Sequence, residues 1–275
     1  MEFASDVVSI EKNGGVGTLW LDRPKKYNAM NESFWLAIPE ALKALESDKE
    51  INAIIVAGRG KHFCVGLDLV DSGMVSHQIV AGESEAVANI KQLQGTTRFQ
   101  EAISSLAKCP VPVIAVIHGH CLGAGIDMVT SCDIRIASAC SNFSVRETRI
   151  GLVADVGTLQ RLPSILNAGH VAELAYSAKD INAARAEKIG LVNDVYESQE
   201  AAYAAGMALA NEIAANPPMA VRGTKFMLQQ SETLTTEQSL LMNGMFTLMT
   251  SLRSNDLQES MKAFAEKRAP KYTGT

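Results

Sequence analysis

Short apolar runs recur along the chain and predict buried strands. They occupy residues 7–10, 16–21, 53–57, 113–117 and 133–137, with one more near 191–195. Gly58-Arg59-Gly60 ends the third run with residues that favour a turn. Runs that are apolar at nearly every position are typical of strands covered on both faces.

Longer segments with helical spacing separate these runs. Asn31 is a plausible N-cap for a helix that continues to about Leu45, and a second helix is expected from about Glu85 to Leu106. The polar, glycine-containing stretch at about 71–84 is expected to be a mobile loop. Strands that alternate with helices predict an α/β fold with largely buried sheets.

From about Val156 the apolar spacing is mostly that of amphipathic helices. Methionines are frequent there and favour adaptable packing within or between subunits; they are Met219, Met227, Met242, Met245 and Met249. We therefore expect an α/β core over residues 1–200 and a helical oligomerisation region over residues 201–275.

Composition limits the possible partners. The chain has 275 residues, 47% of them hydrophobic, and a net charge of −5. The acidic balance argues against a nucleic-acid-binding protein. No apolar run approaches the roughly 20 residues of a membrane span, so a membrane protein is not expected either.

The cysteines and the chain ends indicate a reducing compartment. The number of cysteines is odd, without a CxxC pair or zinc-like spacing; they are Cys64, Cys109, Cys121, Cys132 and Cys140. Reduced thiols and no metal site are expected. The N-terminus does not resemble a signal peptide, and the last residues are not a peroxisomal address. These features predict a cytoplasmic location.

A glycine-rich turn follows the fourth apolar run. Its pattern, Gly119-x3-Gly123-x-Gly125, has the wrong spacing for a dinucleotide fingerprint, which argues against a dehydrogenase. A turn between a strand and a helix leaves backbone N–H groups free. A second small turn, Val65-Gly66-Leu67, also follows a strand. If the two turns converge, they would form an oxyanion hole.

Three carboxylates lie close to this turn in the sequence. Asp127 follows it in the same predicted helix, and Glu147 and Asp155 come later, each among apolar or small residues. Burial there raises a carboxyl pKa toward neutrality. Such acids are typical of a proton-transfer enzyme.

Each acid also has a structural interpretation. Asp127 could favour the first turn of its helix through the dipole. Glu147 could pair with Arg146 or Arg149 on the surface. Asp155 could cap the helix that follows it. These alternatives stay open when each residue is taken alone.

Four other polar or reactive residues are interpreted as structural. Asp133 stands at a strand start. His118 and His120 flank the glycine turn and are expected to be satisfied polar groups rather than catalysts. Cys121 has no recognisable catalytic partners and is expected to be inert.

Several segments occur together in a characteristic order. They are Asp22-Arg23-Pro24-x3-Asn28-Ala29-Met30, Phe63-x2-Gly66-Leu67-Asp68-Leu69, His118-Gly119-x3-Gly123-Ala124-Gly125, Cys132-Asp133-Ile134-Arg135, Gly190-Leu191-Val192 and Glu266-Lys267-Arg268-x-Pro270. With them the chain resembles the enoyl-CoA hydratase/isomerase (crotonase) superfamily over nearly its whole length.

The resemblance implies a fold, an assembly and a substrate. The fold would be a spiral of ββα units with two sheets, and C-terminal helices would form trimers that often pair into hexamers. The substrate would be an acyl-CoA thioester, so that coenzyme A enters with the substrate and no separate cofactor is expected. The thioester oxygen would be held by the N–H groups of Leu67 and Ala124. Residues expected to meet substrate or coenzyme A are Lys25, Val65, Gly66, Leu67, Asp68, Leu69 and Ala124.

Within the superfamily the acids indicate the reaction. Hydratases typically carry two glutamates, whereas this chain has Asp127 and Glu147, and Asp155 where a hydratase has glycine. This arrangement is similar to that of the Δ3,5-Δ2,4-dienoyl-CoA isomerases. It implies that Glu147 is the base at C2 and Asp155 the acid at C6, while Asp127 tunes its neighbours or holds a polar network. The alternatives are a 2-enoyl-CoA hydratase or Δ3-Δ2-enoyl-CoA isomerase that uses Glu147, or an idle member that acts through binding.

Overall fold

The computed structural model describes residues 3–71 and 83–275. The loop expected at about 71–84 lies almost wholly outside the described residues. The described strands form one six-stranded and one three-stranded sheet. The larger sheet has the order β1 (Val8–Asn13), β2 (Val16–Leu21), β3 (Ala53–Gly58), β4 (Val113–Ile117), β6 (Ile134–Ser138) and β9 (Asp194–Tyr196). The smaller has the order β5 (His120–Leu122), β7 (Asn142–Ser144) and β8 (Ile181–Asn182).

The chain passes from the large sheet to the small one in successive turns of a spiral. In the large sheet only β1 and β2 pair in antiparallel fashion, and the other neighbours are parallel. β4 leads after two residues into β5, and β6 leads into β7, so each of these two units supplies one strand to each sheet. This confirms the expected spiral with two sheets.

Helices occupy the connections and the C-terminal part. They are α1 (Glu32–Ser47), α2 (Glu85–Lys108), α3 (Ala124–Thr130), α4 (Thr158–Ile165), α5 (Ala168–Ser177), α6 (Ala183–Ile189), α7 (Gln199–Ala214), α8 (Pro218–Ser231), α9 (Thr236–Met249) and α10 (Asn255–Glu266), with short 3₁₀ turns η1 (Pro24–Lys26), η2 (Glu147–Ile150) and η3 (Ser251–Arg253). The Asn31 side chain accepts a hydrogen bond from Phe34 N at 3.3 Å. The predicted N-cap of α1 is therefore confirmed.

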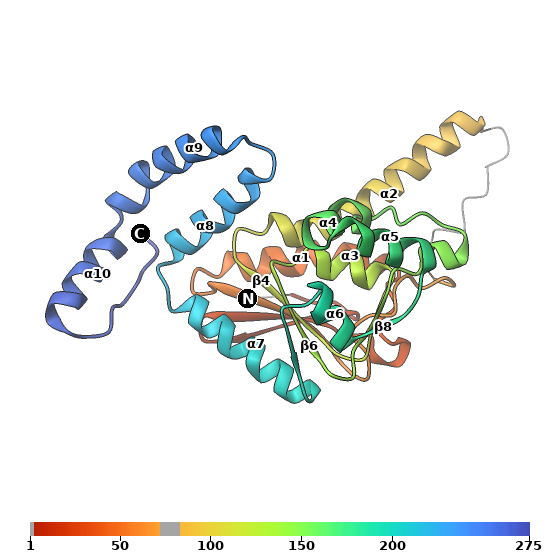
Figure 1. The fold of residues 1–275 in the computed structure, drawn as a ribbon, viewed down its shortest axis with the longest axis horizontal. Coiled ribbons are helices and arrows are strands. Elements are labelled where there is room, and N and C mark those ends of the chain that lie inside the picture. Colours follow the sequence, from red (N-terminus) through yellow and green to blue (C-terminus); the bar gives the residue numbers. More distant parts are fainter. Residues whose placement is uncertain (1–2, 72–82) are drawn as a thin grey trace.

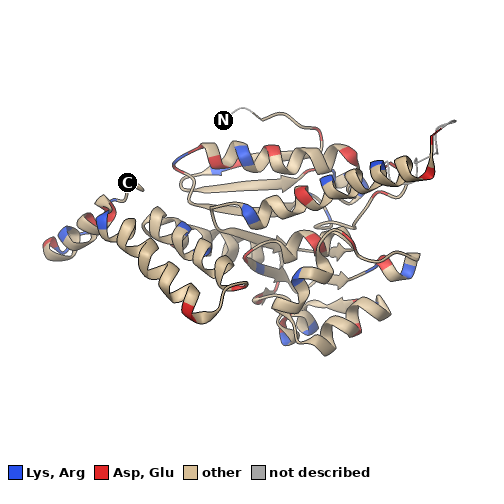
Figure 2. Ribbon diagram, turned by 90° about the horizontal axis from the view of Figure 1, so that it is seen from above, with Lys and Arg blue, Asp and Glu red and all other residues tan. Residues whose placement is uncertain are grey.

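The large sheet is covered on both faces. α7 packs on one face, where the buried Ile55, Ile114 and Val116 meet Ala202 and Ala210. α1, α2 and α3 contribute to the cluster on the other face. Charged side chains lie mainly on the helices and loops, and the strands carry few of them (Figure 2). This burial explains why the strand sequences are apolar at nearly every position.

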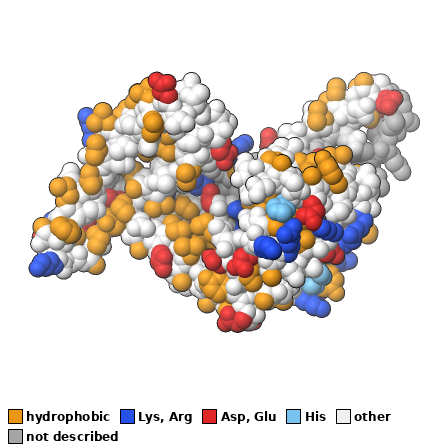
Figure 3. Space-filling model, viewed as in Figure 1, with side chains coloured by type: hydrophobic (Ala, Val, Ile, Leu, Met, Phe, Trp, Pro, Cys, Tyr) orange, Lys and Arg blue, Asp and Glu red, His pale blue; other side chains and the backbone are white. Residues whose placement is uncertain are grey.

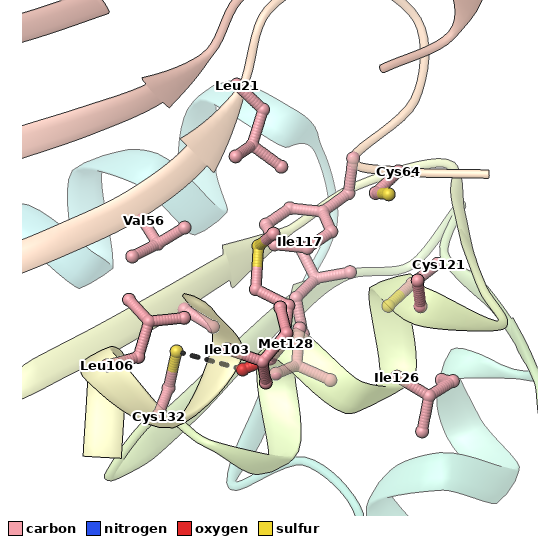
Figure 4. Packing of buried hydrophobic residues seen from close by; sticks show 14 of the residues in the cluster. Leu21, Val56, Cys64, Ile103, Leu106, Ile117, Cys121, Ile126, Met128 and Cys132 are labelled. Carbon is pink, nitrogen blue, oxygen red and sulfur yellow. Dashed lines mark hydrogen bonds between the residues drawn. The ribbon is translucent and has the colours of Figure 1, made fainter. Parts of the chain in front are cut away.

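The thiols are part of this packing. Cys64, Cys121 and Cys132 lie among aliphatic side chains, and the Cys132 thiol donates to the carbonyl oxygen of Met128 at 3.4 Å (Figure 4). Burial raises the pKa of the Cys64 and Cys132 thiols to about 12 and that of Cys121 well above its ordinary value. These thiols therefore stay protonated and unreactive at neutral pH.

The C-terminal helices extend from one side of the core (Figure 1). α8 is fixed to the core by Lys225, whose ammonium group lies 2.6 Å from Asp133 Oδ2 and 3.1 Å from the carbonyl oxygen of Val111. Asp133 also accepts from Val113 N at 2.7 Å, so it is a structural residue as expected. The boundary near residue 200 stays a prediction, since α7, which begins there, lies on the sheet.

α9 carries apolar side chains that no part of the described chain covers. Leu240, Leu241, Met245, Leu248 and Met249 are all exposed. Hydrophobic patches are visible over the C-terminal helices in Figure 3. In the described part of the chain, no helix combines the length and hydropathy that crossing a bilayer requires.

Candidate active site

Two glycine turns meet at one end of α3. Gly66 has φ +95° and Gly123 has φ +53°, conformations that favour glycine. A Cβ on Gly66 would lie 2.9 Å from the carbonyl oxygen of Leu122 and 3.5 Å from Ala124 N. The two turns are therefore in direct contact, and a side chain at Gly66 would separate them.

The backbone around these turns leaves two N–H groups unused. Met30 N donates to the carbonyl oxygen of Gly66 at 2.8 Å, and Asp68 N donates to that of Met30 at 3.0 Å, which fixes Leu67 between them. Ala124 is the first residue of α3, where N–H groups lack helical acceptors. Within residues 3–71 and 83–275, neither Leu67 N–H nor Ala124 N–H has an acceptor. Both are available to a substrate oxygen.

Asp127 is buried in the first turn of α3, with 1% of its surface exposed. Its Oδ1 accepts a hydrogen bond from Thr158 N at 2.5 Å, at the start of α4. Burial raises the pKa of Asp127 to about 6, although the bonds from Thr158 oppose this shift. Asp127 therefore lies in the first turn of α3, as its structural interpretation proposed. Its carboxylate, however, accepts a hydrogen bond from the first residue of α4.

Glu147 begins η2 and lies against the glycine turn. A Cβ on Gly123 would lie 3.3 Å from Glu147 Oε1, and Oε2 is buried with no hydrogen-bond partner in the described residues. Burial, and next the charge of Asp127, raise the pKa of Glu147 to about 7. The surface ion pair is not formed, because Arg146 binds Asp180 at 2.6 Å and Arg149 donates to the carbonyl oxygen of Ala178.

Asp155 lies on the segment before α4 and is exposed to solvent. Partial desolvation of its carboxyl raises its pKa. It does not cap α4, whose N-cap is Gly157 without a side-chain cap. Its carbonyl oxygen accepts a hydrogen bond from Gln100 Nε2 of α2 at 2.6 Å.

The fold brings the three acids close enough to influence one another. The charge of Asp155 raises the pKa of both Asp127 and Glu147. Like charges on partly buried carboxyl groups oppose the ionisation of all three at once, so the three acids together can hold a proton near neutral pH. The chemistry that this permits is proton transfer beside an oxyanion-binding turn.

The predicted substrate-binding residues differ in their surroundings. Lys25 lies in η1 and is exposed, and Val65 to Leu69 form the segment around the first glycine turn. Asp68 is already engaged, because its Oδ2 accepts from Arg23 Nη1 at 2.6 Å and its Oδ1 from Val70 N at 3.1 Å. It stabilises the segment that carries Leu67, and its contact with coenzyme A stays a prediction.

Sequence reasoning missed the residues that hold the segment from Asp155 to Thr158. Arg161 Nη2 donates to Ser104 Oγ of α2 at 2.7 Å, and its guanidinium lies against Gly157. Gln100 holds the same segment at Asp155. The sequence carried one signal for these contacts. Gln100 and Ser104 are four residues apart, which places both side chains on one face of the helix.

The histidines beside the glycine turn have other contacts. His118 is buried and its Nε2 lies 3.0 Å from the carbonyl oxygen of Gly60, as expected for a satisfied polar group. The His62 and His120 rings stack with centroids 4.4 Å apart. His120 Nδ1 is buried without a hydrogen-bond partner in the parts of the chain described. His120 is therefore not the fully satisfied polar group that was expected. No group of three or more His, Cys, Asp or Glu side chains there could hold a metal ion.

Several known proteins are similar to this chain. The relative named "Delta(3,5)-Delta(2,4)-dienoyl-CoA isomerase, mitochondrial" from Dictyostelium discoideum is 38% identical over 95% of this chain and 89% of its own. The protein named "Delta(3,5)-Delta(2,4)-dienoyl-CoA isomerase, peroxisomal" from Arabidopsis thaliana is 36% identical over 99% of this chain and 98% of its own. The crystal structure of an enoyl-CoA hydratase from Bacillus anthracis has a TM-score of 0.86 and 26% identity, covering 98% of this chain and all of that one.

These names correct one expectation. The predicted cytoplasmic location is wrong, because the similar proteins are named as mitochondrial or peroxisomal. Free thiols argue against an oxidising compartment, but they do not distinguish one reducing compartment from another.

The family assignment rests on the whole chain rather than on the site alone. The model of the family described as enoyl-CoA hydratase/isomerase matches residues 11–275. The two-sheet spiral and the paired glycine turns lie within this range. The chain belongs to the enoyl-CoA hydratase/isomerase family.

Proposed function

We propose that this protein is an isomerase that converts a 3,5-dienoyl-CoA into a 2,4-dienoyl-CoA. The observation that carries the proposal is the carboxylate of the half-buried Glu147, whose Oε2 is buried without a partner in the described residues and whose Oε1 lies against the Gly123 turn. A base with a pKa of about 7 is ionised in a large fraction of molecules at neutral pH and still accepts a proton readily.

The first step removes a proton from C2 of the substrate. Glu147 takes this proton, and the electron pair of the C–H bond forms a C1–C2 double bond while negative charge moves to the thioester oxygen. The N–H groups of Leu67 and Ala124 bind that oxygen, which stabilises the extended dienolate. The contact of Glu147 Oε1 with Gly123 keeps the base next to this hole.

The second step returns a proton at C6. Asp155 donates it, the C5–C6 double bond becomes a single bond, and the product is conjugated with the thioester through C2–C3 and C4–C5. Each turnover thus leaves Glu147 protonated and Asp155 ionised, and exchange with solvent restores both. The raised pKa of Asp155 favours its acid form, and its exposure permits this exchange. Asp127 raises the pKa of Glu147 through its charge and holds Thr158.

The substrate proposal has support outside the site. The relatives at 36–38% identity are named as dienoyl-CoA isomerases. A second candidate, 2-enoyl-CoA hydratase, is favoured by the name of the similar crystal structure. Asp155 favours the isomerase, since a hydratase directs both acids to one water near C2 and C3, whereas C2 and C6 need separate groups.

The assembly is also a proposal. We infer a homotrimer, or a hexamer of two trimers, formed through the C-terminal helices. The exposed apolar side chains of α9 support this inference, because monomers rarely leave so many in water. Coenzyme A would lie along residues 65–69 and Lys25, and no further cofactor takes part in the scheme.

The ultraviolet spectrum tests the activity directly. A 3,5-dienoyl-CoA mixed with the enzyme should develop absorbance at longer wavelength, because only the 2,4-product is conjugated with the thioester. Glu147→Gln should abolish the change. If the spectrum of the 3,5-dienoyl-CoA stays constant while 2-enoyl-CoA loses its absorbance by hydration, the isomerase proposal is wrong and the hydratase takes its place.

A further inference from the structure

The segment that carries Asp155 is tied to α2 through Gln100. Gln100 Nε2 donates to the carbonyl oxygen of Asp155 at 2.6 Å. Within the described chain, no other hydrogen bond links Asp155 to another residue. The contact spans 55 positions of sequence, so it couples two separate elements.

A second contact from α2 reaches the same segment one helical turn further on. Ser104 Oγ accepts from Arg161 Nη2 at 2.7 Å, and Arg161 Nη1 donates to the carbonyl oxygen of Val156 at 3.5 Å. Residues four apart share a helix face, so Gln100 and Ser104 hold one stretch of chain from one side.

The rotation of α2 about its axis is fixed by buried residues beside this face. Phe99 is buried and stacks on Trp35 of α1 with ring centroids 4.7 Å apart. Ile103 is fully buried in the core. The direction of Gln100 toward Asp155 is therefore set by packing rather than by its own side-chain conformation alone.

The segment is anchored on both sides of Asp155, because Ala154 and Val156 are buried in the core. Gly157 has φ +132°, and Asp155 is exposed. At the far end Thr158 N is bound by Asp127 Oδ1. Between these anchors, Gln100 makes the hydrogen bond to Asp155 itself.

We propose that Gln100 is a positioning residue for Asp155 in the isomerisation. By holding the Asp155 carbonyl it fixes the backbone from which the carboxyl is directed to C6 of the substrate. The inference rests on the proposed role of Asp155. Gln100 should affect only the proton transfer at C6. Glu147 and the N–H groups of Leu67 and Ala124, which act at C2 and at the thioester oxygen, lie on other parts of the chain.

The test replaces the donor and separates the two proton transfers. Gln100→Met keeps the length of the side chain and removes the hydrogen bond. Isomerisation of a 3,5-dienoyl-CoA should fall roughly 10- to 100-fold, the scale of a misplaced catalytic group. Exchange of the C2 hydrogen with deuterated water should keep its rate. Gln100→Lys, which restores a donor of similar reach, should recover most of the isomerisation.

The control lies on the same helix. The Gln94 side chain is exposed and forms no hydrogen bond with a described residue, so Gln94→Met should leave both rates unchanged. In a protein that carries Asp155→Asn, Gln100→Met should add no further loss, because the two residues act as one unit.

Two failures have different meanings. If Asp155→Asn isomerises at the parent rate, the proposed role of Asp155 fails whatever Gln100 does. If Asp155→Asn is slow but Gln100→Met keeps full isomerisation, or slows C2 exchange equally, Gln100 is a surface contact and the positioning inference is wrong.

Discussion

Asp127 Oδ1 of α3 accepts a hydrogen bond at 2.5 Å from the backbone N–H of Thr158, the first residue of α4, 31 positions later in the chain. One buried carboxylate thereby holds the start of α4 and raises the pKa of Glu147. The two effects can be separated, because an asparagine at this position still accepts the hydrogen bond through its oxygen but carries no charge.

Asp127→Asn should therefore change the pH dependence of proton abstraction. The base must be ionised, so C2 exchange in the parent should rise with pH to a plateau, with a midpoint near the Glu147 pKa of about 7. Removal of the neighbouring negative charge lowers that pKa and moves the midpoint to lower pH. The measurement is the rate of deuterium entry at C2 between pH 5 and 9. An unchanged or higher midpoint would show that Asp127 does not act on Glu147 electrostatically.

Glu147→Gln should stabilise the protein at alkaline pH. The folded-state pKa of about 7 is above the ordinary 4.5, so the folded state is favoured while Glu147 is neutral. That stability is fully present below pH 4.5 and is lost as pH rises through 7. The variant, which cannot ionise, should gain roughly 1–3 kcal/mol in free energy of unfolding at pH 8. It should gain nothing from this source at pH 4.

Urea unfolding at both pH values, at one protomer concentration, provides the measurement. A gain of the same size at pH 4 and pH 8 would mean that ionisation of Glu147 is not its cause.

Ala124→Pro should remove one donor of the oxyanion hole. Ala124 is the first residue of α3, a position that tolerates proline, so folding should be preserved. The kcat of isomerisation should fall by roughly 10²–10³. Ala124→Gly, which keeps the N–H group, should have a mild effect. Parental activity in a folded Pro variant would exclude this N–H group from the hole.

Patterns within one segment predicted much of the fold. The apolar strands, the α1 cap at Asn31 and the start of α2 at Glu85 followed from residues close together in the chain. The resemblance predicted the two sheets and the family. Such features depend on local backbone preferences and on periodic burial, which a sequence displays directly.

Contacts between distant segments could not be predicted in the same way. Asp155 could have been a helix cap, and only the structure shows that Gly157 caps α4 while Gln100 binds the Asp155 carbonyl. Asp68 was expected to meet coenzyme A, yet Arg23 occupies one of its oxygens. One sequence gives the charge of a side chain but not which of several partners the folded chain brings to it.

The assembly can be tested by mass. Leu241 and Met245 are exposed on α9 and lie four residues apart, so they share one face. Light scattering at micromolar concentration should give three or six times the mass of one chain. Substitution of both residues by glutamate should lower that mass, because charges would be buried at the interface. A monomeric parent protein would contradict the proposed trimer.

The most direct test of the central claim is Asp155→Asn assayed for both proton transfers. If Glu147 serves C2 and Asp155 serves C6, deuterium should still enter at C2 at the parent rate. Conversion of 3,5-dienoyl-CoA to the 2,4-isomer should fall by roughly 10²–10⁴, the usual effect of losing a general acid. With Glu147→Gln both rates should fall together, since the dienolate does not form. Isomerisation at the parent rate by Asp155→Asn would contradict the account.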